Sequence, residues 1–215
     1  VHHLLLTHAH FGHIDGLGLF GRETLASRGI DLHVSDAMHQ LVNQTPQWNL
    51  MVQQGVFDVQ TFNHDEQLFN AGNLVIEAVQ IPHRDELSDM HAFIVRGPNK
   101  SLLFLPDHDT WEETLAVHSV SSIREWLTQM QIDIALLDGT FWSKAELGGR
   151  DQSKVPHPPV LQTLNMLGNR EDGDPEVYFT HLNHTNPLYD AEGEQMKQVT
   201  SLGWKVAQQG QRFTL

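Results

Sequence analysis

Short apolar runs alternate along the chain with segments in which apolar residues recur at helical spacing. Runs of this length are typical of buried strands. They predict strands at residues 4–6, 32–34, 57–62, 74–81, 90–95, 101–105, 132–137 and 177–180. A last pair of strands, 205–208 and 212–215, is predicted on either side of a turn at Gln209 and Gly210.

Helices are predicted between many of these strands. Leu17, Phe20 and Leu25 lie at helical spacing before Gly29, which is a stop signal, and they predict a helix at 17–27. Similar signals predict helices at 36–44, 48–55, 119–131 and 158–169. This mixture of elements predicts an α/β (α+β) fold, and a length of 215 residues favours one domain over 1–215.

Several of the predicted strands end abruptly in a histidine or an aspartate. The residues at these ends are His8, His83, Asp107, Asp138 and His181. Strand ends on one edge of a layered sheet can converge, and the loops at such an edge usually carry function. We therefore expect these side chains to meet.

The first of these ends opens the segment 7–16, in which His8, His10 and His13 follow an apolar strand and Gly16 frees the backbone. Three imidazoles released into one loop are typical of a metal site. The alternative from this motif alone is a histidine-rich loop without a special role.

The composition limits the kinds of ligand that a metal site can use and the classes of partner that the protein can bind. The chain has no cysteine, so disulfides and thiolate ligands are excluded and a transition metal must be held by imidazole and carboxylate. The formal net charge of −14 argues against broad affinity for nucleic acid or an anionic membrane. No apolar stretch reaches the roughly 18 residues that span a bilayer. We expect a cytoplasmic protein, and because the sequence begins at Val1, close to the first strand, we expect an N-terminal segment to precede it.

Taken in order, several segments resemble the metallo-β-lactamase superfamily, and within it the proteins related to coenzyme PQQ synthesis protein B. These segments are 7–16, 82–86, 105–107, 138–142, 149–151, 155–158 and 180–187. Ribonuclease Z and cyclic-phosphate diesterases belong to the same neighbourhood. The resemblance covers nearly all of the chain. It implies a four-layer αββα sandwich with a metal site at the sheet edge, lacking its N-terminal strands in this chain.

The resemblance implies that His8, His10 and His83 are ligands of a first metal and that Asp107 is a carboxylate able to bridge two metals. Three neutral imidazoles and one carboxylate suit Zn²⁺, with Mn²⁺ or Fe²⁺ as alternatives in a more open coordination. One or two ions per chain are expected.

A second metal would be served by His13 and His181 together with Asp107. The chain departs from the family here, because Gly12 stands where the family has an aspartate ligand. The occupancy of the second site is therefore in doubt. Asp15 is a conceivable substitute, although a carboxylate at the start of a helix is the plainer interpretation.

The resemblance also places His157 as the acid that protonates a leaving group and Asp138 as the group that orients this imidazole. The alternatives are a turn residue ahead of Pro158 and a cap for the following turn. His184 is expected to support the site or contact substrate. His108 and Asp109 flank Asp107, and we expect them to cap its loop, with contact to substrate as the alternative. Arg84, Asp85 and Glu86 follow His83, and we expect them to form a salt-bridged loop that stiffens the site.

Three functions follow from these residues. The first is a metal-dependent hydrolase, in which a metal-bound hydroxide attacks a small phosphodiester or ester-like substrate. The second is an oxygenase or carrier protein in biosynthesis of a PQQ-type cofactor. The third is a metal-binding protein without turnover, and the observation that suggests it is Gly12 at the position of the aspartate ligand. The expected partner is a small molecule, with no nucleic acid and no membrane, and a homodimer is left open.

Overall fold

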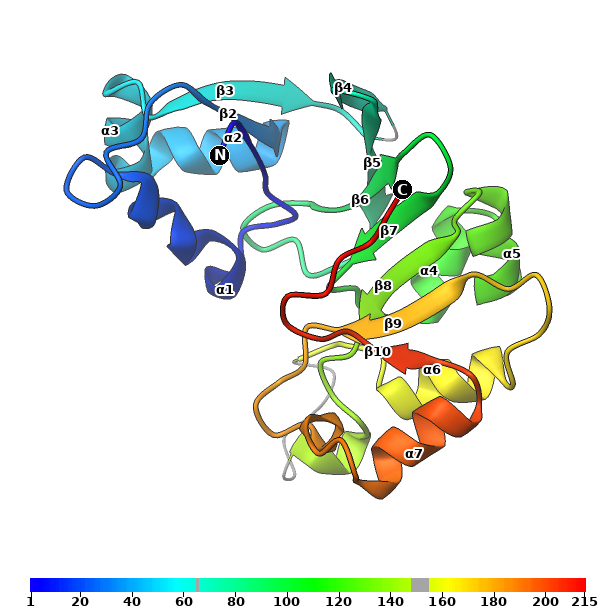
Figure 1. The fold of residues 1–215 in the computed structure, drawn as a ribbon. Helices are drawn as coiled ribbons and strands as arrows, with labels where there is room; N and C mark the ends of the chain where they lie inside the picture. Colours follow the sequence, from blue (N-terminus) through cyan, green and yellow to red (C-terminus); the bar gives the residue numbers. More distant parts are fainter. Residues whose placement is uncertain (65, 148–154) are drawn as a thin grey trace.

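Two β-sheets lie in the middle of the fold, with helices on the outside of each (Figure 1). The computed structural model describes residues 1–64, 66–147 and 155–215. The segment 149–151, which supports the family resemblance, lies outside the described residues. Separate apolar clusters fill the space between each sheet and its helices, and another lies between the sheets. The predicted four-layer αββα arrangement is therefore confirmed.

The smaller sheet has three parallel strands in the order β1-β2-β3. They are β1 (His3–Leu5), β2 (Ile30–Ser35) and β3 (Phe57–Phe62). Side chains alternate across a strand, so Leu32 and Val34 of β2 point to one face, where they are fully buried. They belong to the apolar cluster that also includes side chains of α2 (Asp36–Gln44) and α3 (Pro46–Gln53).

The larger sheet has seven strands in the order β10-β9-β8-β7-β6-β5-β4. They are β4 (Gln67–Ala71), β5 (Leu74–Ile81), β6 (Met90–Arg96), β7 (Ser101–Leu105), β8 (Ile134–Asp138), β9 (Glu176–Thr180) and β10 (Lys205–Val206). Pairing is antiparallel from β4 to β7 and parallel from β7 to β10. As a result β5, β7, β8 and β9 all end at the same edge of the sheet.

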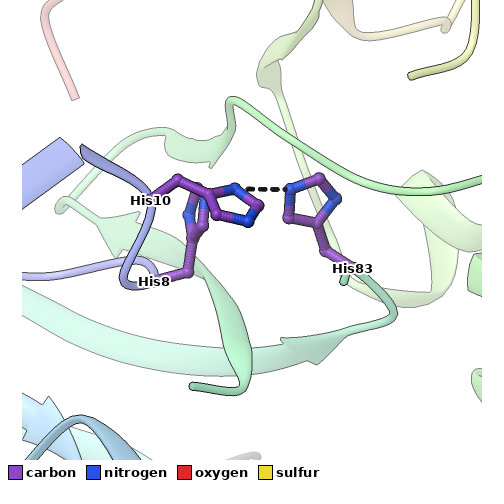
Figure 2. Close-up of side chains that lie close together, drawn as sticks. All are labelled: His8, His10 and His83. Carbon is purple, nitrogen blue, oxygen red and sulfur yellow. Dashed lines mark hydrogen bonds between the residues drawn. The ribbon is translucent and has the colours of Figure 1, made fainter. Parts of the chain in front are cut away.

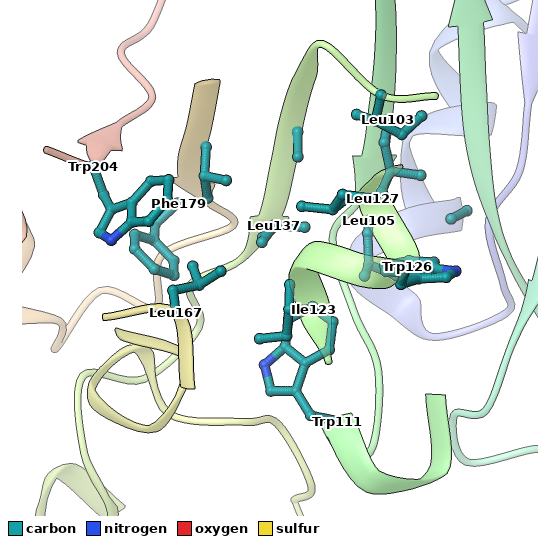
Figure 3. Close-up of a cluster of buried hydrophobic side chains, with 14 of the residues drawn as sticks. Leu103, Leu105, Trp111, Ile123, Trp126, Leu127, Leu137, Leu167, Phe179 and Trp204 are labelled. Carbon is teal, nitrogen blue, oxygen red and sulfur yellow. The ribbon is translucent and has the colours of Figure 1, made fainter. Parts of the chain in front are cut away.

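Four helices cover the outer face of the larger sheet. They are α4 (Trp111–Val117), α5 (Ile123–Gln129), α6 (Val160–Leu167) and α7 (Glu194–Ser201). The indoles of Trp111, Trp126 and Trp204 are buried in the core beneath them (Figure 3). Trp111 Nε1 donates to Thr163 Oγ1 at 2.8 Å, so its polar atom is satisfied inside the core and joins α4 to α6.

The cluster between the two sheets is small. Its buried members are Phe62, Ala78 and Phe93, and Leu5 and Leu68 pack against them. The two sheets are also joined at the edge where the strands end, because the backbone N–H of His91 donates to the carbonyl of Thr7 at 2.9 Å. The histidine segment is thereby fixed against the larger sheet.

Two predicted elements were wrong. Residues 17–27 do not form an α-helix: a short α1 (Phe11–Ile14) continues into a 3₁₀ helix, η1 (Asp15–Phe20), and turns follow. Gly16, Gly18 and Gly21 lower the helix propensity of this stretch. Residues 205–208 and 212–215 do not form a hairpin, because β10 pairs in parallel with β9.

Other elements were not predicted at all. These are β4, α4, α7 and the short 3₁₀ helices η2 (Lys144–Leu147) and η4 (Pro187–Tyr189). Beyond β10 the chain forms no further strand, and Phe213 and Leu215 pack against β7, β8 and β9. Within the described residues no helix combines the length and apolar character needed to cross a bilayer.

Candidate metal centre

Histidine and aspartate side chains converge where the strands of both sheets end. His8 follows β1, His83 follows β5, Asp107 follows β7, Asp138 is the last residue of β8, and His181 directly follows β9. The parallel direction of these strands brings their ends to one edge. The expectation that these strand ends converge is confirmed.

Three imidazoles point their inner nitrogens at one another. His8 Nε2 lies 2.9 Å from His10 Nδ1, and His10 Nδ1 lies 3.2 Å from His83 Nε2 (Figure 2). Ligand atoms of a tetrahedral zinc ion, with bonds of about 2.0–2.1 Å, are separated by roughly 3.3 Å. The distances from His10 Nδ1 to the other two nitrogens are close to that value.

The outer nitrogens of the same rings face oxygen atoms. His83 Nδ1 lies 2.9 Å from Asp109 Oδ1, His8 Nδ1 lies 3.1 Å from Thr7 Oγ1, and His10 Nε2 lies 3.4 Å from a carboxylate oxygen of Glu86. For His83 and His8, an outer N–H held by an oxygen leaves the lone pair on the inner nitrogen, which is the tautomer that a metal requires.

Asp107 extends the cluster toward a second group of ligands. Its Oδ2 lies 2.9 Å from His13 Nε2 and 3.9 Å from His8 Nε2, while its Oδ1 lies 3.6 Å from His181 Nδ1. One atom each from His8, His13 and Asp107 lie within 4.8 Å of one another. Asp107 therefore touches both groups of imidazoles.

Burial and charge keep these groups in the forms that bind a cation. Burial lowers the pKa of His8 to about 2 and also lowers the pKa of His83, against the opposing charge of Asp107. Burial alone would raise the pKa of Asp107, but contact with His13 and the charges of His181 and His157 lower it. The imidazoles are neutral and the carboxylate is ionised at neutral pH.

One buried atom supports the fit of a cation directly. Asp107 Oδ2 is buried and makes no hydrogen bond of acceptable geometry, even though His13 Nε2 is 2.9 Å away. An unsatisfied buried carboxylate oxygen is costly unless another group neutralises it. Together with the three inner nitrogens, this atom fits a divalent transition metal.

His157 and Asp138 form a pair beside the candidate metal ligands. His157 Nδ1 lies 2.8 Å from Asp138 Oδ2 and 3.3 Å from Asp107 Oδ1, and both His157 and Asp138 are buried. Burial acts to lower the pKa of His157, but the charge and hydrogen bond of Asp138 and the charge of Asp107 outweigh it, so the pKa is raised. His157 therefore holds a proton more firmly than an ordinary histidine.

Thr140 connects this pair to His181. Its hydroxyl donates to Asp138 Oδ1 at 2.7 Å and lies 2.9 Å from His181 Nδ1. His181 itself has a φ of +57°, a left-handed conformation that few non-glycine residues adopt. Such strain is concentrated at functional sites. It lets the chain turn directly after β9, with the imidazole beside Thr140 and Asp107.

The remaining candidates lie apart from this cluster. Asp15 is exposed at the start of η1, and His184 is exposed on the loop after β9. Among the described residues, neither forms a hydrogen bond or an ion pair with the other candidates. Apart from its chain neighbours and the backbone of its own helix, nothing in the described part of the chain lies within 4 Å of the point where a Cβ on Gly12 would stand. The role expected for Asp15 or His184 stays a prediction, and so does the weakening of the second site.

Sequence reasoning missed the contacts that Asp109 and Thr140 make with candidate ligands. Asp109 was expected to cap a loop or contact substrate, yet its Oδ1 lies against His83 Nδ1. Thr140 lies against His181 Nδ1. Glu86 was expected in a salt-bridged loop beside the site, and it lies 3.8 Å from Arg84 and 3.4 Å from His10 Nε2. Asp109 lies two residues from a predicted ligand, and this proximity was the one available signal.

Comparisons with known proteins match the chain to one family and one fold. A protein-family model described as "Beta-lactamase superfamily domain" matches residues 1–182. Coenzyme PQQ synthesis protein B of Acinetobacter baumannii (strain SDF) is 24% identical over 155 residues, which cover 66% of this chain and 48% of that protein. The chain thus spans about half the length of the curated relatives it matches.

Two solved structures share the fold. Zn²⁺-bound PqqB from Methylobacterium extorquens matches with a TM-score of 0.75 and 18% identity, covering 100% of this chain and 73% of that one. Igni18, described as a novel metallo hydrolase from the archaeon Ignicoccus hospitalis, matches with a TM-score of 0.58 and 19% identity, covering 96% and 75%. At these identities the likeness establishes the fold alone.

Proposed function

The chain belongs to the β-lactamase superfamily domain family, and on that premise we propose that it is a metal-dependent hydrolase that cleaves an ester or phosphodiester bond in a small molecule. The observation that carries this proposal is the convergence of three inner imidazole nitrogens beside the buried Asp107. When bound, a divalent metal lowers the pKa of coordinated water toward neutrality and polarises the oxygen of a carbonyl or phosphoryl group.

The residues around the metal ligands supply the proton transfer. His157 Nδ1–H donates to Asp138 Oδ2, which fixes the ring, and the raised pKa favours the form that also carries a proton on Nε2. That proton can pass to the oxygen of a leaving group, which is general-acid catalysis. His157 also lines a cavity of about 310 Å³ with Asp109 and Lys144. A substrate in this cavity would lie next to the acid.

Charges of both signs border the cavity. Lys144 lines it together with Asp109 and Glu112, and the charge of Arg84 lies close enough to His10 and His157 to act on the pKa of both. The two cations suit the oxygens of a phosphodiester, whereas the carboxylates suit a neutral ester. The proposal therefore covers both bond types.

Metal analysis tests the first part of the proposal. After dialysis, the protein is expected to retain at least one transition metal per chain, with Zn²⁺ the expected ion and a second ion bound more weakly because Gly12 supplies no carboxylate. His8→Ala and Asp107→Ala should lose the tightly held metal, whereas His39→Gln, a change on α2, should keep it. A fully folded wild-type protein with no affinity for metal would contradict the proposal.

The role of His157 as the general acid is tested by comparing substrates with different leaving groups. We expect His157→Gln to slow hydrolysis of an alkyl phosphodiester by about 10²–10⁴-fold and to slow a nitrophenyl phosphodiester far less, because nitrophenolate leaves without a proton. The measurement is the rate of hydrolysis of each substrate by the zinc-loaded variant and by the zinc-loaded wild type. An equal loss on both substrates would remove His157 from this role.

A role in PQQ biosynthesis is the second candidate, and the name of the curated relatives favours it. In that case the protein would act as an oxygenase or a carrier for a cofactor precursor. Metal identity separates the candidates: iron-dependent oxygen consumption without hydrolysis would support the oxygenase. Tight metal binding with neither activity would support a metal-binding protein without turnover.

A further inference from the structure

Three ligand-type side chains outside the candidate metal centre lie together on the smaller sheet. They are His3 on β1 and Asp31 and His33 on β2. In the parallel register, His3 pairs with Asp31 and Leu5 pairs with His33. Asp31 and His33 are two residues apart on one strand, so their side chains share a face with that of His3.

The distances within this group suit a metal ion. His3 Nδ1 lies 3.3 Å from Asp31 Oδ2 and 3.3 Å from His33 Nε2. One ligand atom from each of the three residues lies within 4.8 Å of the other two. A tetrahedral zinc ion with ligands at about 2.0–2.1 Å places its ligand atoms roughly 3.3 Å apart. The contact between the two rings is longer than the usual N–H hydrogen bond of about 2.9–3.0 Å.

The surroundings hold the two rings in place and leave access from solvent. Phe69 of β4 stacks on His3 and His33, with ring centroids at 4.4 and 4.1 Å. His33 is buried, while the side chains of His3 and Asp31 are 33% and 38% exposed. The group borders a cavity of about 420 Å³ that Gln60 also lines. Burial lowers the pKa of His33, so that ring is neutral at pH 7.

We propose that His3, Asp31 and His33 form a metal site of their own, separate from the candidate centre, which takes a borderline divalent transition ion such as Zn²⁺. Two imidazoles and one carboxylate are ligands that this class of ion accepts, and positions not filled by the protein are open to water. Bound there, the ion would tie β1 to β2 beneath Phe69. Its role would be structural, because the ion would join two neighbouring strands of the smaller sheet.

Zinc titration in a protein without the candidate centre tests this site. In His8→Ala/Asp107→Ala, we expect calorimetry to show one equivalent of bound Zn²⁺ and thermal unfolding to shift upward by a few degrees with zinc. Adding Asp31→Asn or His3→Ala should weaken that binding at least tenfold. His2→Ala removes an exposed imidazole next to the group and should leave the affinity unchanged.

The same substitution in the otherwise wild-type protein serves as a second test in case the double variant does not fold. There, Asp31→Asn should lower the zinc stoichiometry by one equivalent. The zinc at the candidate centre, which His8→Ala removes, should stay bound. No zinc binding in the double variant, or the same affinity with and without Asp31→Asn, would overturn the proposal and leave the two rings as packing partners of Phe69. If the wild-type protein bound zinc at His3, Asp31 and His33 but not at the candidate centre, that result would contradict the proposed hydrolase and leave the second site standing.

Discussion

At the scale of single residues, the carboxylate of Asp109 connects the loop after Asp107 to the candidate metal ligand His83. Its Oδ1 lies 2.9 Å from His83 Nδ1 and also accepts from the backbone N–H of Arg84. One carboxylate oxygen thus holds both the ring of His83 and the chain that follows it. Such partners fix the tautomer of the ligand and raise its basicity.

We predict that Asp109→Asn weakens metal binding by about 10- to 100-fold without unfolding the protein. An amide can still accept the Nδ1 proton, but it lacks the negative charge. A competition titration with a chelator of known affinity measures the change. Thr110→Ser, at the neighbouring cap of α4, serves as the control and should keep wild-type affinity.

The backbone of His181 gives a second prediction, which separates stability from metal binding. At a φ of +57°, a side chain other than glycine costs about 1–2 kcal/mol. The metal-free His181→Gly protein should therefore exceed His181→Ala in free energy of unfolding by about 1 kcal/mol, although both lack the imidazole. Urea unfolding of the two variants gives this difference, and equal stabilities would show that the backbone there carries no strain.

At the scale of elements, a charged cluster secures the end of the larger sheet. Glu176 on β9 accepts from Lys205 of β10 at 2.6 Å and from the hydroxyl of Tyr178 at 2.9 Å. These hydrogen bonds, led by that of Lys205, lower the pKa of Glu176 from 4.5 to about 2. A carboxylate with a lowered pKa stabilises the fold above its ordinary pKa and loses this contribution as pH falls toward the folded value.

Glu176→Gln should therefore destabilise the protein at pH 7 and matter progressively less between about pH 4.5 and pH 2. Solvent reaches the 29% exposed side chain, so the effect at pH 7 is expected to be no more than about 1 kcal/mol. Denaturant unfolding at pH 7 and pH 3 tests the trend. Glu194→Gln, at an exposed pair on α7, should show little effect at either pH.

Elements were predictable from the sequence where an apolar run ended in a polar residue. This pattern located β5, β7, β8 and β9, and it brought Asp107 and His181 to one edge. β4 was missed because Gln67–Ala71 is only partly buried and carries no apolar run. The helix expected at 17–27 did not form because the helical spacing of its apolar residues was outweighed by two glycines, Gly18 and Gly21.

The contacts that orient the ligands could not be predicted in the same way. Thr140 and His181 are 41 residues apart, and His83 and Asp109 are 26 apart. No periodicity in the sequence specifies which distant loop supplies an oxygen to which ring nitrogen. The candidate ligands were therefore named in advance, whereas the residues that hold them became visible only in the folded chain.

At the scale of the whole molecule, the candidate centre lies across the junction of the two sheets. His8, His10 and His13 follow the smaller sheet, and His83 and Asp107 follow strands of the larger one. The apolar cluster between the sheets is small, with Phe93 5% exposed at its centre. Metal affinity should therefore depend on how firmly the sheets are held together.

Phe93→Ala should cost about 3–5 kcal/mol of stability and should also weaken metal binding, although Phe93 is not a ligand. Leu103→Ala, in the core beneath the helices, should cost about 2–5 kcal/mol with little change in metal affinity. Thermal unfolding and chelator competition on both variants compare the two effects. The same loss of affinity in each would show that the sheet junction has no special part in binding.

The spacing of the ligands has a consequence for a chain that contains no cysteine. His10 and His83 are 73 residues apart, so one ion bound to both would close a loop of that length. In chain-entropy terms, a permanent cross-link of this span restricts the unfolded chain by about 4 kcal/mol. Coordination bonds would give this chain the effect of a disulfide with one difference: the cross-link would open and close with the supply of free metal instead of the redox state of its surroundings.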